Sequence, residues 1–461
     1  MTSIKPKVGI VMASHVREPS DFSLGLIRSG IDLLQKQHIE VYFEESPLTK
    51  DQDIRQAIVE MKSRDLDAYI ICPGNWIEPP VLCHPLEEIR GENILLWGFP
   101  ESMKLIRNGH FLGSHSAFTV LRNALNQMGF RFRGIQGFPE ESTIECIADY
   151  LRAAWATRYL KRAKLGLIGY CSMGIYTTCF DQQKIRNVFG TEIDSSADSY
   201  ILYKEMEKIP TSEIETAVHD ISRRCDVDDS IREDGSLETS IRMYLALKKM
   251  AFNNNWVGLS VKCQHEFSSY LKCTACLPLS LLTDEGIMCT DEGDVHALIT
   301  MSVMRSLSDG EAIYFGDIYR LSEGGFLMDH CGLSPHSCSK QDQRVRLLAQ
   351  TPRISKDGKT TGGVISSYLF KEGFVTIGRI ENQRDGSYQF HFSKGRVKPI
   401  KSIAYGWSSL IFTPEEDEEW FSENQLANHY IFVYRDIKNR ITEFCNITGV
   451  KPVTYGTRVL H

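Results

Sequence analysis

The sequence lacks an excess of positive charge and any long hydrophobic run. Its 461 residues contain 52 Lys and Arg against 59 Asp and Glu, a formal charge of −7, and this balance argues against a nucleic-acid-binding surface. A membrane-spanning helix needs roughly 18 or more apolar residues in a row, and no segment approaches that length. The N-terminal run VGIVMA is too short for a secretory signal. We therefore expect a cytosolic, cytoplasmic protein without nucleic-acid or membrane partners.

Several common functional motifs are also missing. The 13 cysteines, an odd number for a chain of this length, fit reduced thiols better than a disulfide framework. Cys273 and Cys276 have no second cysteine pair or histidine at zinc spacing, so we interpret this pair as structural. Gly166, Gly169 and Gly174 match neither a dinucleotide-binding nor a Walker-type loop. The G-x-S-x-G elbow that would indicate a serine hydrolase does not occur in the sequence.

The first 160 residues alternate apolar, strand-like runs with segments of helical periodicity. Strands are predicted at 7–13, 39–45, 68–74 and 93–98, and helices at 22–37, 53–67 and 116–129. This alternation is typical of a parallel, doubly wound sheet that binds ligands near the carboxyl ends of its strands. We therefore expect an α/β fold for this region.

A predicted helix over 141–162 leads into a second α/β unit, whose first strand is expected at 164–170. After about residue 345 the pattern becomes β-rich, with Gly and Asp-Gly turns between apolar runs. The chain closes on a strand, a helix and a strand from residue 429 onward. We expect three domains: an α/β domain at 1–160, a central α/β domain at 161–345 and a β-rich domain at 346–461.

Two carboxylates in the segment 289–319 stand out. The segment predicts a helix opened by Thr290, with Asp291 and Glu292 in its first turn, followed by an apolar strand that ends in Asp317. A first-turn acid such as Glu292 is also explained by helix capping alone, because carboxylates favour the helix N-terminus. Asp317 follows buried apolar residues directly, and a buried carboxylate needs a partner or a metal.

Histidines near these acids are candidate ligands for a divalent cation. Carboxylate oxygen and imidazole nitrogen together suit such ions, and two acids with one histidine leave coordination positions open for a substrate. The candidates are His330 and His336 in DHCGLSPHSC and His429 in ANHYIFVYRD. His429 is expected at a strand entrance. Each of these histidines taken alone is also explained by a structural role.

Five segments together resemble the L-fucose isomerase and L-arabinose isomerase family. They are GLIGYCSMGIYT, WVGLSVKCQHEFSSYLKCTACLPLSLL, CTDEGDVHALITMSVMRSLSDGEAIYFGDI, HCGLSP and ANHYIFVYRD, and the resemblance extends from about residue 160 to the C-terminus. It implies a metal-dependent aldose-ketose isomerase with a divalent cation, most often Mn²⁺. It also implies two Rossmann-like doubly wound domains, a β-rich C-terminal domain, and a homo-oligomer with sites at subunit contacts.

The resemblance also assigns roles to the acids and histidines. By position, Glu292 and Asp317 correspond to the family's catalytic acids, which also bind the metal, and His429 corresponds to its late metal-binding histidine. His330 lies in a segment that supplies a further metal ligand in arabinose isomerases, which leaves open whether it contacts the cation or the sugar.

Other residues correspond to sugar contacts. Gln264 matches the family's K-C-Q glutamine, Asn428 precedes the metal-binding histidine, and Trp407 lies near a sugar-stacking tryptophan. His115 stands near the position from which relatives reach a neighbouring subunit's site. The N-terminal segment departs from the fucose isomerase pattern, and this leaves the identity of the sugar open.

The implied reaction moves a proton between C2 and C1 of a pentose, a deoxyhexose or a modified hexose. The cation would polarise the carbonyl, and the two acids would transfer protons on either side of a cis-enediolate. Two alternatives stay open from the sequence. One is a non-catalytic sugar-binding relative, and the other is an epimerase or lyase that uses the same metal centre.

Overall fold

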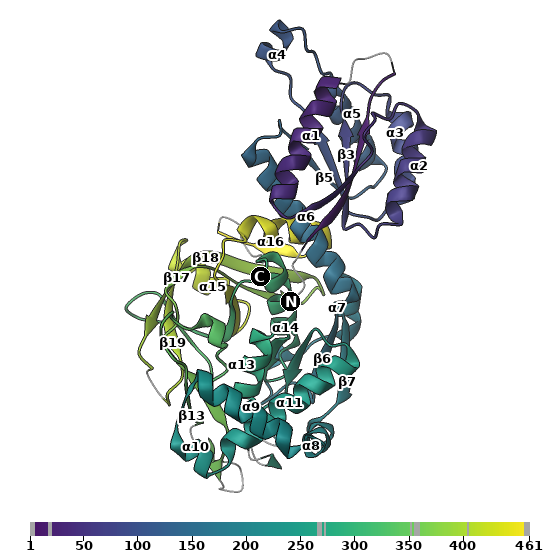
Figure 1. Ribbon diagram of the computed structural model, residues 1–461. Coiled ribbons are helices and arrows are strands. Elements are labelled where there is room, and N and C mark those ends of the chain that lie inside the picture. Colours follow the sequence, from purple (N-terminus) through teal and green to yellow (C-terminus); the bar gives the residue numbers. More distant parts are fainter. Residues whose placement is uncertain are drawn as a thin grey trace. The chain divides into compact units, whose positions relative to one another are not determined.

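The computed structural model describes residues 5–16, 21–264, 270–271, 273–350, 353–354, 360–402 and 405–455. The chain forms two compact units, which we name the N-terminal unit and the larger unit (Figure 1). The N-terminal unit consists of Ser3–Arg158 with Thr442–Ile447, and the larger unit consists mainly of Tyr159–Ile441. The division into three domains at residues 160 and 345 stays a prediction.

The N-terminal unit is built on a five-stranded parallel sheet of order β2-β1-β3-β4-β5. This is the order of a doubly wound fold, with helices between successive strands. Its elements lie within two residues of most sequence-based bounds: β1 (Lys7–Ala13), α1 (Asp21–Lys36), β2 (Glu40–Phe43), α2 (Asp51–Lys62), β3 (Ala68–Pro73), α3 (Pro79–Leu86), β4 (Ile94–Gly98), α4 (Met103–Arg107), α5 (Ser114–Gln127), β5 (Phe132–Gln136) and α6 (Glu141–Arg162).

The sheet is buried on both faces, which explains why the sequence of β1 is a continuous apolar run. Val8 and Ile10 pack with Trp97 in one core cluster, whereas Val11 and Ala13 belong to a second cluster. Successive strand residues point to opposite faces, so the two clusters cover the two sides of the sheet. The predicted parallel sheet is therefore confirmed for this unit.

The larger unit contains a second parallel sheet, of order β10-β9-β6-β7. The strands are β6 (Lys164–Ile168), β7 (Glu192–Ala197), β9 (Gly258–Val261) and β10 (Met288–Asp291). The accompanying helices are α7 (Gln182–Phe189), α8 (Ser199–Glu207), α9 (Thr211–Arg224), α10 (Asp229–Glu233), α11 (Ser236–Asn254), α13 (Cys276–Asp284) and α14 (Val295–Leu307). The loops after β6, β9 and β10 leave from the same edge of this sheet.

An antiparallel barrel completes the larger unit, so the predicted β-rich C-terminal region is confirmed. Six strands follow one another in the order β17-β20-β11-β12-β19-β18, and a β17–β18 pairing closes the ring. Two of them, β11 and β12, precede residue 345. The barrel strands are β11 (Ile313–Arg320), β12 (Phe326–Asp329), β17 (Gly373–Asn382), β18 (Tyr388–Ile400), β19 (Ser409–Pro414) and β20 (His429–Val433), with β21 (Lys451–Val453) paired to β18.

Helix α14 connects the parallel sheet and the barrel. It packs against β9 and β10 on one side and against β11, β17 and β20 on the other. Nearly all of its residues are buried, as expected for a helix that is enclosed by two sheets. The remaining elements are β8 (Asp226–Val227), β13 (Arg346–Ala349), β14 (Arg353–Ile354), β15 (Thr360–Thr361), β16 (Val364–Ser367), α15 (Glu418–Glu423) and α16 (Lys438–Thr448).

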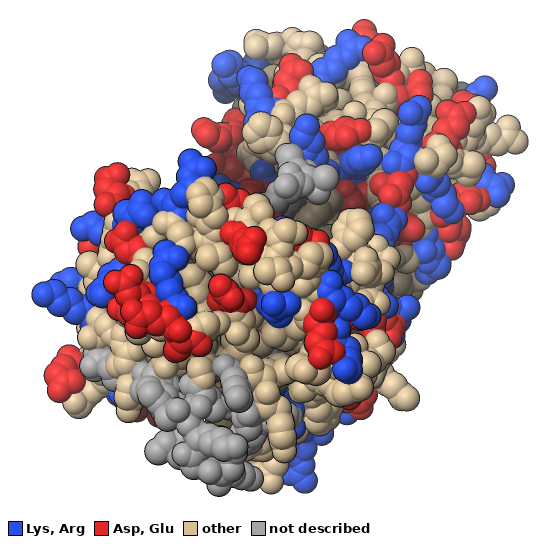
Figure 2. Space-filling view, turned by 60° about the horizontal axis from the view of Figure 1, so that its bottom comes forward, with Lys and Arg blue, Asp and Glu red and all other residues tan. Residues whose placement is uncertain are grey.

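Two surface properties bear on partners. Basic and acidic side chains are interspersed on the face that Figure 2 shows. Within the described part of the chain, no helix combines the length and apolar character needed to cross a membrane. The expected absence of nucleic-acid and membrane partners stays a prediction.

Candidate metal centre

The acidic segment after β10 forms a tight turn. β10 ends at Asp291, Glu292 has a left-handed backbone with φ of 58°, and Gly293 follows with φ of 70°. α14 begins directly after Asp294, whose carboxylate caps the helix by accepting the Ala297 backbone N–H at 2.8 Å. A left-handed non-glycine residue is uncommon, and such strain is concentrated at functional sites. The turn directs the Glu292 side chain into a buried position.

The prediction of a helix opened by Thr290 is therefore wrong. Thr290 lies in β10, where its backbone pairs with Ser260 of β9 and its hydroxyl donates to the Ser260 hydroxyl at 3.0 Å. The strand ladder holds this segment extended until the turn. Gly293 is required there, because a Cβ at this position would collide with the carbonyl oxygen of Tyr170.

Asp317 and His429 come from neighbouring barrel strands. Asp317 lies inside β11, which continues to Arg320, so the expectation that the strand ends at Asp317 is wrong. His429 is the first residue of β20, which confirms the expected strand entrance. The two residues are direct partners in the β11–β20 ladder, and directly paired residues present their side chains on the same face.

Glu292 and Asp317 both approach the imidazole of His429. The His429 Nε2 atom lies 3.5 Å from a carboxylate oxygen of Glu292 and 3.5 Å from one of Asp317. The imidazole is fully buried, and Nε2 has no hydrogen-bond partner among the described residues. Two carboxylates and a buried imidazole nitrogen without a hydrogen bond form a donor set that a divalent cation can occupy.

The opposite side of His429 is held by Asp294. The Nδ1 atom lies 2.9 Å from Asp294 Oδ2, and this carboxylate can only accept, so Nδ1 carries a proton and donates it. In the neutral form of the ring, which is the form that binds a cation, Nε2 carries the lone pair and faces Glu292 and Asp317. Carboxylates in this position commonly set the tautomer and orientation of metal-binding histidines.

Asp294 belongs to a buried charge network. The Arg379 guanidinium from β17 donates to Asp294 Oδ2 at 2.7 Å and to Glu381 Oε2 at 2.6 Å, and Arg379 is fully buried. Glu381 also lies 2.8 Å from His296 Nδ1 of α14. Although burial opposes its ionisation, the charge of Arg379 holds the pKa of Asp294 well below its usual range. Sequence reasoning missed this network, although an arginine inside the apolar run GFVTIGRI was a usable signal.

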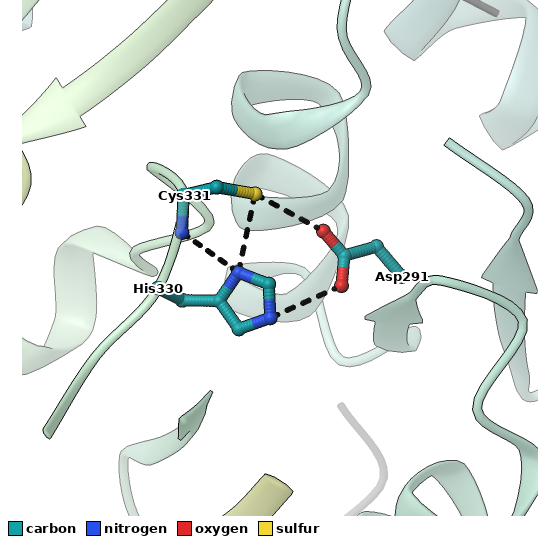
Figure 3. A group of neighbouring side chains, drawn as sticks. All are labelled: Asp291, His330 and Cys331. Atoms are coloured by element: carbon teal, nitrogen blue, oxygen red, sulfur yellow. Dashed lines mark hydrogen bonds and ion pairs between the residues drawn. The ribbon is translucent and has the colours of Figure 1, made fainter. Parts of the chain in front are cut away.

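A second group lies beside the first and consists of Asp291, His330 and Cys331 (Figure 3). His330 Nε2 is 3.3 Å from Asp291 Oδ1, and Cys331 Sγ is 3.6 Å from Asp291 Oδ2. All three residues are buried. One ligand atom from each of Asp317, His330 and His429 also falls within 4.8 Å of the others. His330 is thus near both Asp291 and Asp317. Asp291 and Cys331 were not among the site residues predicted from the sequence.

The charges of this region shift several protonation equilibria. Burial and repulsion by Asp291 raise the pKa of Glu292. Burial would lower the pKa of His429, but the hydrogen bond and charge of Asp294 outweigh it and raise that pKa to about 9. Burial also opposes the charge on His330, yet Asp291 raises its pKa to about 10. The raised pKa values favour the protonated forms of Glu292, His429 and His330. A bound cation would displace the protons from the residues that hold it.

The structure brings other candidates near these groups. Asn428 donates from Nδ2 to Asp317 Oδ1 at 2.9 Å and accepts from the Thr177 hydroxyl at 3.2 Å. Gln264 is buried and follows the carboxyl end of β9. Trp407 is half-buried and packs against the apolar cluster that contains Cys331. The assignment of these residues as sugar contacts stays a prediction.

His115 lies in the N-terminal unit. It is the second residue of α5, is exposed, and its Nδ1 is 2.8 Å from Gln136 Nε2. The expected role in a neighbouring subunit's site, like the expected homo-oligomer, stays a prediction. His336, the remaining histidine candidate, lies 2.8 Å from the Ser366 hydroxyl through Nε2, which supports a structural role.

Comparison with known proteins finds relatives over most of the chain. It is 23% identical to a protein named sulfoquinovose isomerase from Alkalicoccus urumqiensis, over 76% of this chain and 77% of that protein. It is 21% identical to proteins of the same name from Priestia aryabhattai and Priestia megaterium, over 89% of this chain and 90% of theirs. No family model matches the chain.

These relatives are enzymes that are named as isomerases of a sugar. The prediction of an enzyme of the aldose-ketose isomerase type is confirmed at this level. The described residues include groups that could hold a metal ion. Membership of the L-fucose or L-arabinose isomerase family and the choice of Mn²⁺ stay predictions.

Proposed function

We propose that this protein is a metal-dependent aldose-ketose isomerase that acts on a modified hexose, sulfoquinovose. The observation that carries the proposal is the convergence of Glu292, Asp317 and His429, with His429 Nε2 at 3.5 Å from both carboxylates. The substrate follows from the relatives, which are named sulfoquinovose isomerase and match this chain over 76% to 89% of its length.

Glu292, Asp317 and His429 would hold the cation. The buried Nε2 atom that lacks a hydrogen bond supports this assignment, because an unpaired polar atom in the interior is costly unless a ligand satisfies it. A divalent cation, which we propose to be Mn²⁺, would polarise the sugar carbonyl and stabilise negative charge on its oxygens. Arg379 and Asp294 would keep His429 in the tautomer that binds metal.

The two acids would carry the proton transfers. In the open-chain sugar, one carboxylate removes the proton from C2 and returns it to C1, and the other assists the transfer between the two oxygens. Burial with repulsion by Asp291 raises the pKa of Glu292, as expected for a general acid or base. Asn428 would orient Asp317 through its 2.9 Å hydrogen bond, and Gln264 would contact sugar hydroxyls.

The test compares sugars in deuterated water. The Mn²⁺-loaded protein is incubated with sulfoquinovose and with glucose, which differ only at C6, and with L-fucose and L-arabinose as further aldoses. We expect a ketose product with deuterium at C1 from sulfoquinovose, and at least about tenfold slower conversion of the others. Glu292→Gln and Asp317→Asn serve as controls and should abolish exchange. Exchange with inversion at C2 would favour an epimerase, and saturable binding without exchange into any sugar would contradict the proposal.

A further inference from the structure

The imidazoles of His330 and His429 make opposite hydrogen bonds through Nδ1. His330 Nδ1 accepts the backbone N–H of Cys331 at 2.8 Å, as Figure 3 shows. The Cys331 thiol lies 3.2 Å from the same nitrogen. His429 Nδ1 instead faces the Asp294 carboxylate at 2.9 Å. The Nδ1 atom of His330 therefore faces a hydrogen-bond donor, whereas the Nδ1 atom of His429 faces an acceptor.

These partners determine which nitrogen carries the proton. A nitrogen that accepts an N–H bond presents its lone pair, so the neutral His330 ring must carry its proton on Nε2. A doubly protonated ring would carry a proton on Nε2 as well. A protonated nitrogen has no lone pair for a metal, whereas the neutral His429 ring, with its proton on Nδ1, presents a lone pair on Nε2.

The Nε2–H group of His330 is available to a ligand. It lies 3.3 Å from Asp291 Oδ1 but forms no aligned hydrogen bond with a described residue, and it is buried. The Phe315 ring packs at 4.8 Å from both imidazoles and supports their orientation. The ring centroids of His330 and His429 lie 5.4 Å apart, so the His330 donor is next to the atoms that would bind the cation.

We infer that His330 is a hydrogen-bond donor to a sugar oxygen on which negative charge develops, and that it is not a ligand of the cation. This inference rests on the proposed isomerase function. A fixed donor aimed at such an oxygen lowers the barrier without forming a bond. The alternative use of the same residues is a thiophilic cation bound by Asp291, His330 and Cys331, which would need the lone pair of His330 Nε2.

The experiment compares matched variants of the two histidines. Mn²⁺ binding is titrated by calorimetry on the wild-type protein, His330→Gln and His429→Gln, and Zn²⁺ is titrated in parallel. Glutamine can place an amide donor near the position of Nε2. We expect Mn²⁺ affinity within about twofold of wild type for His330→Gln, and a loss of at least about tenfold for His429→Gln. For turnover, His330→Leu should lose about 10²- to 10³-fold, and His330→Gln should keep most of the rate.

The tautomer is measured independently, in the metal-free wild-type protein. His330 is the only histidine followed by cysteine, so ¹³C,¹⁵N-His and ¹⁵N-Cys labelling identifies the Cys331 amide in the spectrum. We expect coupling across the N–H···Nδ1 bond and the ¹⁵N shifts of a ring that is protonated on Nε2. This measurement requires no variant to fold.

Two results would overturn the inference. The first is a ring protonated only on Nδ1, and the second is a loss of Mn²⁺ or Zn²⁺ affinity in His330→Gln as large as in His429→Gln. If the wild-type protein binds no Mn²⁺ and exchanges no sugar, the proposed function fails. The ¹⁵N spectrum then still decides whether His330 presents a donor or a lone pair.

Discussion

The two parallel sheets of this protein share a topology class but differ in what gathers at their carboxyl edges. In the N-terminal unit, this edge carries neutral polar pairs: Asn75 accepts the His15 backbone N–H at 2.8 Å, and the Ser23 hydroxyl donates to the Gly74 carbonyl at 2.5 Å. In the larger unit, the edge presents buried acids and imidazoles. All groups that could hold a cation in the described part of the chain lie there.

The site in the larger unit depends on the layer that packs against its sheet. A barrel lies against the edge of the larger unit through α14, and its strands β11 and β20 bring Asp317 and His429 opposite Glu292. Strand ends in an α/β sheet provide only half of a site until a second surface closes over them. A parallel sheet therefore indicates at which edge a site can form. The layer that packs against that edge, here the barrel, determines whether reactive side chains meet there.

The largest expected effect comes from the acids themselves. Glu292→Gln should reduce turnover of sulfoquinovose by about 10²- to 10⁴-fold, because a general acid or base is lost. The matched control is Glu78→Gln in the N-terminal unit, where the carboxylate lies 3.3 Å from His15 at the surface. We expect near wild-type turnover for the control. Equal losses in both variants would contradict the contrast between the two edges.

The next effect concerns stability. Arg379→Met leaves Asp294 and Glu381 buried without their cation and should lower the free energy of unfolding by about 3–5 kcal/mol. Arg320→Met removes an exposed ion pair with Glu419 and should leave the unfolding midpoint unchanged. Urea titrations monitored by circular dichroism measure both. An unchanged midpoint for Arg379→Met would show that the buried network contributes little.

A smaller effect is expected on metal affinity. Asp294→Asn replaces the carboxylate that accepts from His429 Nδ1, and it should weaken Mn²⁺ binding by about 10- to 100-fold. The control is Asp329→Asn, because Asp329 pairs with Asp317 across β11–β12 and is close to the site without contacting His429 in the described structure. Calorimetry on the two variants distinguishes orientation of the ligand from a general loss of negative charge, which would weaken both equally.

The last prediction concerns local protection by the metal. At a free concentration near 100 times the dissociation constant, a bound ligand stabilises the folded state by about 2.7 kcal/mol. Hydrogen exchange monitored by mass spectrometry should therefore slow in β10, β11 and β20 when Mn²⁺ is added, and recover with a chelator. Peptides from β1 and β3 should not change. Equal protection in both units would place the cation elsewhere.

Local patterns predicted many elements well. The run at 7–13 coincides with β1, and the helix expected over 141–162 coincides with α6. The acidic turn was misread because Thr290, Asp291 and Glu292 have the composition of a helix start, whereas pairing with β9 keeps them extended. Capping by Asp294 depends on where that strand ends, and this is a property of the sheet.

For the site, the sequence identified individual candidate residues, but it did not show which other residues they contact. The sequence identified Glu292, Asp317 and His429 as candidates, and the structure brings them together. It did not identify Asp294 and Arg379 as partners, which are 85 positions apart in the chain. A buried arginine can pair with any acid that the fold delivers, so no local pattern specifies the choice.

The sequence by itself determined the periodicities that make two parallel sheets and a β-rich region, because strand and helix burial repeat over a few residues. It also determined which side chains could act as acids or ligands. The tertiary structure decided that α14 lies between sheet and barrel, that Glu292 points inward, and that Nδ1 of His330 faces a donor whereas Nδ1 of His429 faces an acceptor. Those features depend on contacts between distant segments, and such contacts exist only once the barrel has closed.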